Sequence, residues 1–146
     1  MLVTLGVTQT GERRVLDLRL AGAESATAWR EVIESRVRRH IGVPALAVID
    51  GTPALVAELR AVGPQLPVQR CTVHKLRNLL AKAPRRLHDE LTEDYRRMIH
   101  AAAAADVSAA RKAFRVKWRR TCADVVTSLD EASDDLFTFL AFPASQ

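Results

Sequence analysis

A single carboxylate, Asp50, stands where a catalytic or metal-binding group is expected. The five residues before it, 45–49, are all apolar, and Val48 and Ile49 are β-branched. This pattern is typical of a short strand that is buried on both faces of a parallel sheet. Open α/β sheets place their ligand sites at the carboxyl ends of such strands. A carboxylate at this point either holds a hard cation or accepts hydrogen bonds from backbone N–H groups, and the residues alone leave both roles open.

A Cys-x-x-His pair, Cys71 and His74, opens the second helix after Asp50, with Thr72 as its expected cap. The spacing is that of half a zinc site, but a structural zinc site needs four protein ligands, and the other Cys and His residues occur singly. Two further roles stay open. In one, the thiol and the imidazole form hydrogen bonds with neighbouring groups or orient Asp50. In the other, they are simply a buried cysteine and a partly exposed histidine.

Basic residues surround this segment. The candidates for contact with a polyanion are Arg70, Lys75, Arg77 and Lys82, with Arg85 and Arg86 beyond them. A metal-bearing carboxylate beside a basic rim suits a phosphodiester substrate.

The net charge of +5 is unevenly distributed. Residues 67–122 hold 14 Lys and Arg against 5 Asp and Glu, whereas residues 123–146 hold 5 acidic residues and no Lys or Arg. The basic block is either a face for nucleic acid or a set of solvated helix faces.

The elements that must position these residues follow from periodicity. Alternation over 3–7 and 16–20 predicts a hairpin with Val3, Leu5, Leu16 and Leu18 on its apolar face. A helix capped by Ser25, the Asp50 strand and a helix that begins at Pro53 come next. Everything after about residue 72 is expected to be helical, with one last helix that packs Leu129 to Leu140. The fold class is therefore α/β.

Length and composition narrow the class of protein. The chain has 146 residues, of which 48% are hydrophobic, so a single domain with a real core is expected. The two cysteines do not suggest a disulfide framework, which favours the reducing cytoplasm. Because no apolar run approaches the roughly 18–20 residues of a membrane span, no membrane association is expected.

The segment from Val48 to Pro84 resembles the Mutator-class transposases of bacterial insertion sequences. These proteins have an Asp-Gly before a helix and, further on, a Gln-Arg-Cys-x-x-His-Lys-x-Arg-Asn motif. The motif here comprises Gln69, Arg70, Cys71, His74, Lys75, Arg77 and Asn78. Residues 6–29, which include Trp29, resemble the family's hairpin and following helix, and residues 136–145 resemble its Phe-Pro segment, so the resemblance covers essentially the whole chain.

The resemblance implies an RNase H-like core with an Asp-Asp-Glu triad, in which Asp50 matches the second Asp. Such a triad holds divalent ions, Mg²⁺ or Mn²⁺, for the cleavage and strand transfer of insertion-sequence DNA at its terminal inverted repeats. Cys71 and His74 match a family signature outside the triad. Residues 1–83 are then a partial core that lacks its first strand, and residues 84–146 are a helical insertion that stops before the catalytic Glu.

These departures predict an internal fragment that is inactive in strand transfer when alone. The missing strand lies between the hairpin and the Asp50 strand, so the unpaired edges predict a poorly stable or self-associating chain. Glu131, Asp134 and Asp135 could replace the missing Glu, but solvated helix charges explain them. Two other functions stay open: a non-enzymatic DNA-binding or interfering module that acts through residues 67–122, and a small zinc-binding structural protein.

Overall fold

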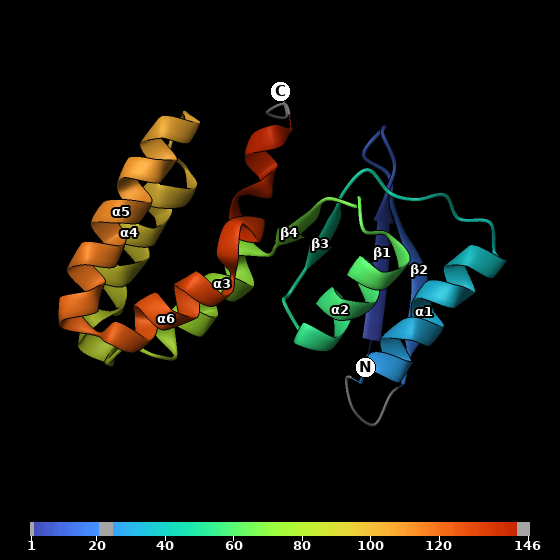
Figure 1. Ribbon diagram of the computed structural model, residues 1–146, viewed down its shortest axis with the longest axis horizontal. Helices are drawn as coiled ribbons and strands as arrows, with labels where there is room; N and C mark the ends of the chain where they lie inside the picture. Colours follow the sequence, from blue (N-terminus) through green and yellow to red (C-terminus); the bar gives the residue numbers. More distant parts are fainter. Residues whose placement is uncertain (1, 21–24, 143–146) are drawn as a thin grey trace. The chain divides into compact units, whose positions relative to one another are not determined.

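The computed structural model describes residues 2–20 and 25–142. The chain divides into two compact units, one built from residues 1–45 and 51–66, the other from residues 46–50 and 67–146. Both units contain helices and short strands (Figure 1), which confirms the α/β class. Among the described residues, the strands form two separate two-stranded sheets.

The first unit contains a hairpin and two helices. Strands β1 (Leu2–Val7) and β2 (Arg13–Arg19) pair antiparallel, and helices α1 (Ala26–Arg38) and α2 (Pro53–Val62) pack together. Ser25 caps α1 as expected, because its hydroxyl accepts a hydrogen bond of 3.2 Å from the Ala28 N–H. Pro53 stands in the first turn of α2.

The solvent exposure of the two faces of the hairpin differs from the expectation. Leu5 and Leu18 are 60% and 62% exposed, so the apolar face predicted to be buried is open. A register shift between Thr4 and Leu5 moves Leu16 to the opposite face from Leu18. There Leu16 packs over Gly6, where an added Cβ would lie 2.9 Å from the Leu16 Cδ1. The alternating pattern did not reveal this bulge.

A small apolar core and one ion pair hold α1 and α2 together. The buried residues are Trp29, Val32 and Ile33 of α1 with Leu55 and Leu59 of α2. The Arg30 guanidinium donates two hydrogen bonds of 2.9 and 3.0 Å to the buried Glu58 carboxylate. The hydrogen bond and charge of Arg30 lower the pKa of Glu58 despite some burial.

The second unit begins with two short strands and continues as helices. Strands β3 (Ala47–Ile49) and β4 (Val68–Arg70) pair in parallel. The helical elements that follow are α3 (Thr72–Leu80), η1 (Arg85–Leu87), α4 (His88–Ile99), α5 (Ala104–Thr121), α6 (Ala123–Glu131) and η2 (Ser133–Ala141). The expected helical region is confirmed, but its last helix is divided. Ser133 has a φ of 56°, which interrupts the helix between α6 and η2.

One apolar core runs through these helices. Its fully buried members include Leu79 of α3, Leu91 and Met98 of α4, Trp118 of α5 and Leu136 of η2. Helices α3 and α4 share this core across the boundary expected at residues 83/84, so packing does not separate the two sides. The division into catalytic core and insertion stays a prediction.

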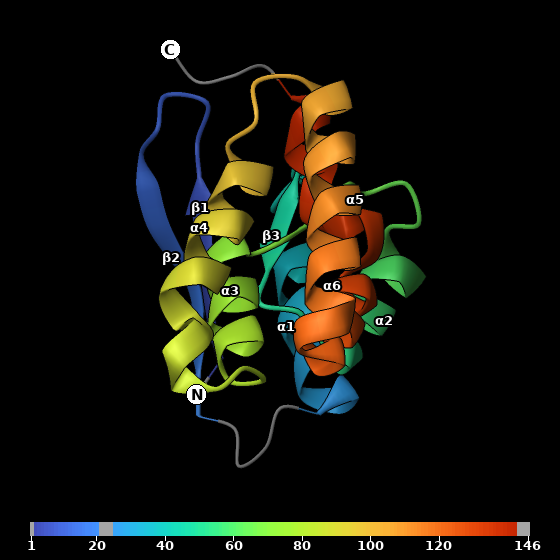
Figure 2. The ribbon, with the colours of Figure 1, turned by 90° about the vertical axis from the view of Figure 1, so that its left-hand side faces the viewer.

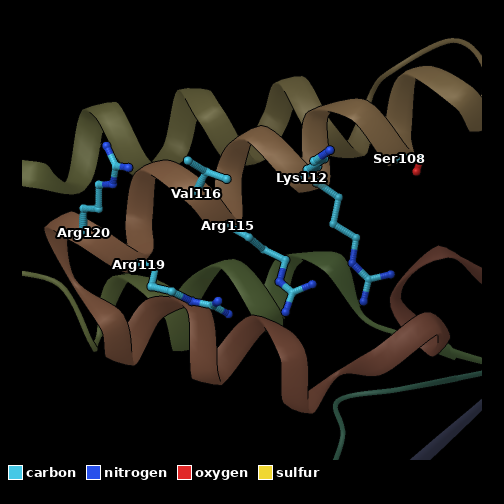
Figure 3. A pocket seen from close by; sticks show the side chains of 7 residues that line it. Ser108, Lys112, Arg115, Val116, Arg119 and Arg120 are labelled. Carbon is cyan, nitrogen blue, oxygen red and sulfur yellow. The ribbon is translucent and has the colours of Figure 1, made fainter.

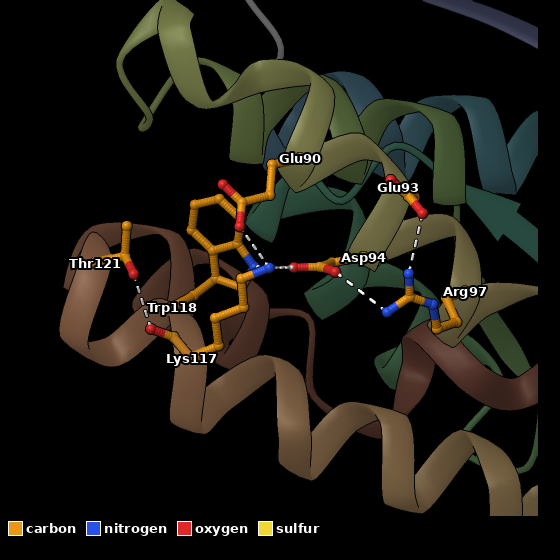
Figure 4. A network of polar contacts seen from close by, with 7 residues as sticks. All are labelled: Glu90, Glu93, Asp94, Arg97, Lys117, Trp118 and Thr121. Atoms are coloured by element: carbon orange, nitrogen blue, oxygen red, sulfur yellow. Dashed lines mark hydrogen bonds and ion pairs between the residues drawn. The ribbon is translucent and has the colours of Figure 1, made fainter.

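A polar network joins α4 to α5 (Figure 4). The Lys117 ammonium of α5 lies 2.6 Å from an Asp94 oxygen and 2.7 Å from a Glu90 oxygen of α4. The Trp118 indole N–H also donates to Asp94, at 3.1 Å. The hydrogen bonds of Lys117 to Asp94 and then to Glu90 raise the pKa of Lys117. Helix α5 also packs against α6, and the two helices are seen beside each other in Figure 2.

Within the described residues, none of the helices is both long enough and apolar enough to span a membrane.

Candidate functional site

The carboxyl ends of β3 and β4 lie at the same edge of their parallel pair. Ile49 is in register with Arg70, and the Cys71 N–H donates a hydrogen bond of 2.7 Å to the Ile49 carbonyl. Asp50 and Cys71, which are 21 positions apart in the sequence, are therefore neighbours in space. Asp50 is exposed at this edge. Which of the roles left open for Cys71 and His74 applies is not decided by this proximity.

The backbone after Asp50 depends on Gly51. Its φ is 105°, in a region that side-chain-bearing residues rarely adopt. This glycine lets the chain turn immediately after the strand, so that α2 starts only three residues after Asp50. The Asp-Gly pair thus places a carboxylate at the very end of the strand.

Cys71 and His74 lie at the start of α3, where the cap differs from the expected one. Cys71 takes the N-cap position and Thr72 is the first helical residue, with no capping hydrogen bond from a side chain. Cys71 is half-buried and His74 is exposed. The Tyr95 hydroxyl donates a hydrogen bond of 2.9 Å to the Thr72 carbonyl. Burial, and then the charge of the Cys71 thiolate, raise the pKa of Tyr95.

A complete metal site is not present within residues 2–20 and 25–142. No three His, Cys, Asp or Glu side chains of these residues are grouped closely enough to hold an ion. A structural zinc ion needs four protein ligands, and a Mg²⁺ ion needs octahedral oxygen coordination. The described donors therefore fit neither a zinc site at Cys71 and His74 nor a full divalent-ion site at Asp50.

The structure places two of the predicted DNA contacts, Arg70 and Lys75, in the interior. Arg70 is 6% and Lys75 is 1% exposed. The Lys75 ammonium lies 2.7 Å from a Glu131 carboxylate oxygen and donates a second hydrogen bond, of 2.8 Å, to the Ser128 carbonyl. Arg70 makes two hydrogen bonds, of 3.1 and 3.3 Å, to the same carboxylate. Both charges are used within the fold, because α6 supplies their counter-ion.

Glu131 is more than the solvated helix charge expected from the sequence. Its side chain is 51% exposed, but its carboxylate accepts hydrogen bonds from two buried cations. Partial burial raises the pKa of Glu131, but hydrogen bonds from Lys75 and then Arg70 outweigh this effect, so the pKa is lowered. The only available sequence signal was the opposite charge of the basic block and the acidic tail.

Gln69 is a further residue whose role the sequence did not indicate. Its buried side-chain amide donates a hydrogen bond of 2.8 Å to the Leu136 carbonyl and accepts one of 2.8 Å from the Phe139 N–H. The Thr138 hydroxyl donates to the Val68 carbonyl at 2.6 Å. The turns of η2 thus hold β4 through Gln69 and Thr138, and they stabilise the strand that carries Cys71 at its end.

Arg77 and Lys82 are the predicted contacts that remain exposed. Arg77 lies in α3, and Lys82 lies in the turn that follows this helix. Of the four predicted DNA-binding residues, the structure therefore leaves two at the surface and encloses two.

Comparison with known proteins identifies the family. Residues 1–146, the whole chain, match the family described as "Transposase, Mutator family". This chain belongs to the Mutator family of transposases. The resemblance read from the Asp-Gly and Gln-Arg-Cys-x-x-His motifs is thereby confirmed.

Individual relatives are transposases of bacterial insertion sequences. The chain is 28% identical over 144 residues to the transposase for insertion sequence element IS1201 of Lactobacillus helveticus, covering 97% of this chain and 38% of the relative. It is 29% identical over 143 residues to that for ISRM5 of Rhizobium meliloti, covering 98% and 36%. For IS6120 of Mycolicibacterium smegmatis the identity is 28% over 144 residues, covering 99% and 45%. The chain thus spans less than half the length of these transposases.

In this Mutator-family segment the motif residues and Asp50 have different surroundings. Gln69, Arg70 and Lys75 bind other parts of the second unit, whereas Asp50 and His74 are exposed at or near the strand ends. The buried motif residues thus stabilise the fold, and the exposed ones remain accessible.

Proposed function

We propose that this chain is part of the catalytic region of an insertion-sequence transposase that cleaves DNA and transfers its strands. The observation that carries the proposal is the match to the Mutator family along all 146 residues. The relatives are named as transposases of insertion sequences, and the chain aligns with them over 97% or more of its length in the three cases given.

Asp50 is, in this proposal, one of three carboxylates of an Asp-Asp-Glu triad. Its exposed position at the carboxyl end of β3 supports the role, because ligand sites of α/β sheets lie at such ends. The assembled site would take Mg²⁺ or Mn²⁺, ions that polarise phosphodiesters and activate the attacking oxygen when bound. Among the described residues, no three His, Cys, Asp or Glu side chains are grouped closely enough to hold an ion. In this proposal the other two carboxylates of the triad lie outside the described residues.

The RNase H-like fold is part of the same proposal. That fold has a strand between the hairpin and the strand of Asp50. Here β1 with β2 and β3 with β4 form two separate sheets, which is the arrangement expected where this strand is not among the described residues. Without this strand, the neighbouring strands would have edges open to pairing. For this reason we expect the isolated chain to self-associate.

The test is made in a transposase of full family length that contains this segment. Asp50→Asn keeps the size of the side chain and removes its charge. We expect it to abolish excision of an element flanked by terminal inverted repeats, with a loss of at least about 1,000-fold, because a triad ligand is lost. Asp89→Asn, which changes an exposed carboxylate at the start of α4, is the matched control and should excise normally. Equal excision by Asp50→Asn would overturn the assignment.

The isolated chain gives a second test. We propose that it does not cleave terminal-repeat DNA in Mg²⁺ or Mn²⁺, because one carboxylate cannot hold two like-charged ions at a fixed separation. Metal-dependent cleavage by the purified chain would refute this. Normal excision by Asp50→Asn in the full-length protein, together with salt-sensitive DNA binding by this chain, would instead favour the alternative, a non-enzymatic DNA-binding or interfering module that acts through residues 67–122.

A further inference from the structure

Helix α5 carries a dense row of cations on one side. We call the five residues Arg111, Lys112, Arg115, Arg119 and Arg120 the basic stripe. Together with Ser108 and Val116 they line a shallow hollow of about 620 Å³ (Figure 3). Their spacings of three, four and one residues place them in two adjacent rows along the same side of the helix. None of the five was singled out as a site from the sequence.

Acidic partners neutralise only part of this charge. Arg111 lies 2.7 Å from an Asp134 oxygen and also over the Phe137 ring, at 5.0 Å from its centroid. Arg115 lies 3.0 Å from Asp130. Lys112, Arg119 and Arg120 are exposed, and in the described part of the chain no acidic residue pairs with them. The stripe thus keeps three uncompensated positive charges on a rigid helix.

Not every cation of α5 lacks a partner. Lys117, which is outside the stripe, points to α4 and is held by Glu90 and Asp94 (Figure 4). Within the stripe, Arg111 and Arg115 are held by acids of η2 and α6. The acids of the neighbouring helical elements thus leave the other three cations of the stripe without a partner among the described residues.

We infer that the basic stripe of α5 is a contact surface for the phosphate backbone of double-stranded DNA. From Arg111 to Arg120 the helix advances about 13 Å. Duplex DNA of that length carries roughly eight phosphates on its two strands, so each of the three unpaired cations has a phosphate within reach. The inference rests on the proposed function, since that function makes DNA the substrate of the protein.

The composition of the stripe favours phosphate over an acidic protein. Four of its five cations are arginines, whose planar guanidinium groups match phosphate oxygens in pairs. Protein–protein interfaces have cores that are depleted of charged residues and enriched in aromatic ones. Val116, which is 54% exposed, is the only large apolar side chain that lines the hollow. Because contacts to the phosphate backbone carry no sequence information directly, we expect the stripe to bind without sequence preference.

The test compares two triple variants of the full 146-residue chain. The first, K112Q/R119Q/R120Q, removes the unpaired cations of the stripe. The matched control, R13Q/R39Q/R96Q, removes three exposed cations of β2, of the end of α1 and of α4 that do not line the hollow and that lack an ion pair among the described residues. Both lose the same charge. Binding of a fluorescein-labelled 30-base-pair duplex of arbitrary sequence is followed by anisotropy between 50 and 200 mM KCl.

We expect the stripe variant to lower the slope of log K against log salt concentration by about 2.7, since each phosphate contact contributes about 0.9. Over this fourfold range of salt, the wild-type affinity should then fall about 40-fold more than that of the variant. The control should keep the wild-type slope. Circular dichroism melts check that both variants fold. If the triple stripe variant does not fold, Arg119→Gln alone is used, and it should lower the slope by about 0.9.

Three results would overturn the inference. They are equal slopes for wild type and stripe variant, an equal decrease in both triple variants, or displacement of the duplex by polyglutamate as effectively as by unlabelled DNA. The last would assign the stripe to an acidic protein. Failure here is separate from failure of the proposed function, because the effect of Asp50→Asn on excision does not depend on the slope measured with this chain.

Discussion

The basic block contains two kinds of cation, and the difference between them is instructive. Arg70 and Lys75, beside the Asp50 edge, are buried and share the carboxylate of Glu131. Lys112 and Arg119, on α5, are exposed and lack an acidic partner among the described residues. Residue type and local charge density are similar in the two places. Only the position of α6 decides that the first pair supports the fold while the second remains available to a ligand.

This contrast implies that the two kinds of cation contribute differently to stability. A charge that is buried with its counter-ion becomes costly when that counter-ion is removed, because the remaining charge cannot regain its hydration. A solvated charge contributes little, and its removal leaves the fold almost unchanged. Three comparisons of variants test this distinction.

The largest effect is expected for Glu131→Ala, which leaves the 1% exposed Lys75 ammonium with the Ser128 carbonyl as its remaining partner. Loss of one partner of a buried pair costs about 3–5 kcal/mol, and we expect about 2–3 kcal/mol here because Glu131 is half exposed and water screens the pair. Urea denaturation measures the change. Asp124→Ala, an exposed acid of the same helix, is the control and should cost less than about 1 kcal/mol. Similar losses for both variants would remove the distinction.

A smaller effect is expected from acid. The pKa of Glu131 is lowered from its ordinary value of 4.5 in the folded state. A carboxylate of this kind stabilises the fold above its unfolded pKa, and that contribution is lost as the pH falls through its folded pKa. The difference in unfolding free energy between wild type and Glu131→Gln should therefore be constant from pH 7 to about 5 and decrease below about 4.5. A difference that did not change down to pH 3 would contradict the assigned ion pairs.

The smallest effect distinguishes two neighbours on α5. Arg111→Gln removes an ion pair with Asp134 and a contact with the Phe137 ring, and should cost about 1 kcal/mol. Lys112→Gln removes an exposed and unpaired charge, and should change stability by less than about 0.5 kcal/mol. Thermal melts of the two variants measure the difference. If Lys112→Gln were the more destabilising, the stripe would be part of the structural charge network rather than a free surface.

Much of the fold was predictable from local pattern. The strand before Asp50, the helix that begins at Pro53 and the helical region after residue 72 follow from periodicity and from proline and glycine positions. The two strands of the hairpin were predictable, but not the side to which each residue points, because Leu16 is an extra residue in β2 between the partners of Thr4 and Leu5 and lies on the opposite face from Leu18. The interruption at Ser133 was likewise hidden, since the helical pattern continues on both sides of it.

The family, the strand before Asp50 and the basic character of the central block could be predicted from the sequence, because motifs, apolar runs and charge are properties of neighbouring residues. Which cations remain exposed depends on tertiary packing. Lys75 and Glu131 are 56 positions apart, and their contact depends on how α6 returns to α3. The sequence could not reveal this, because the partner of a charge is set by packing between distant elements and not by the residues around it.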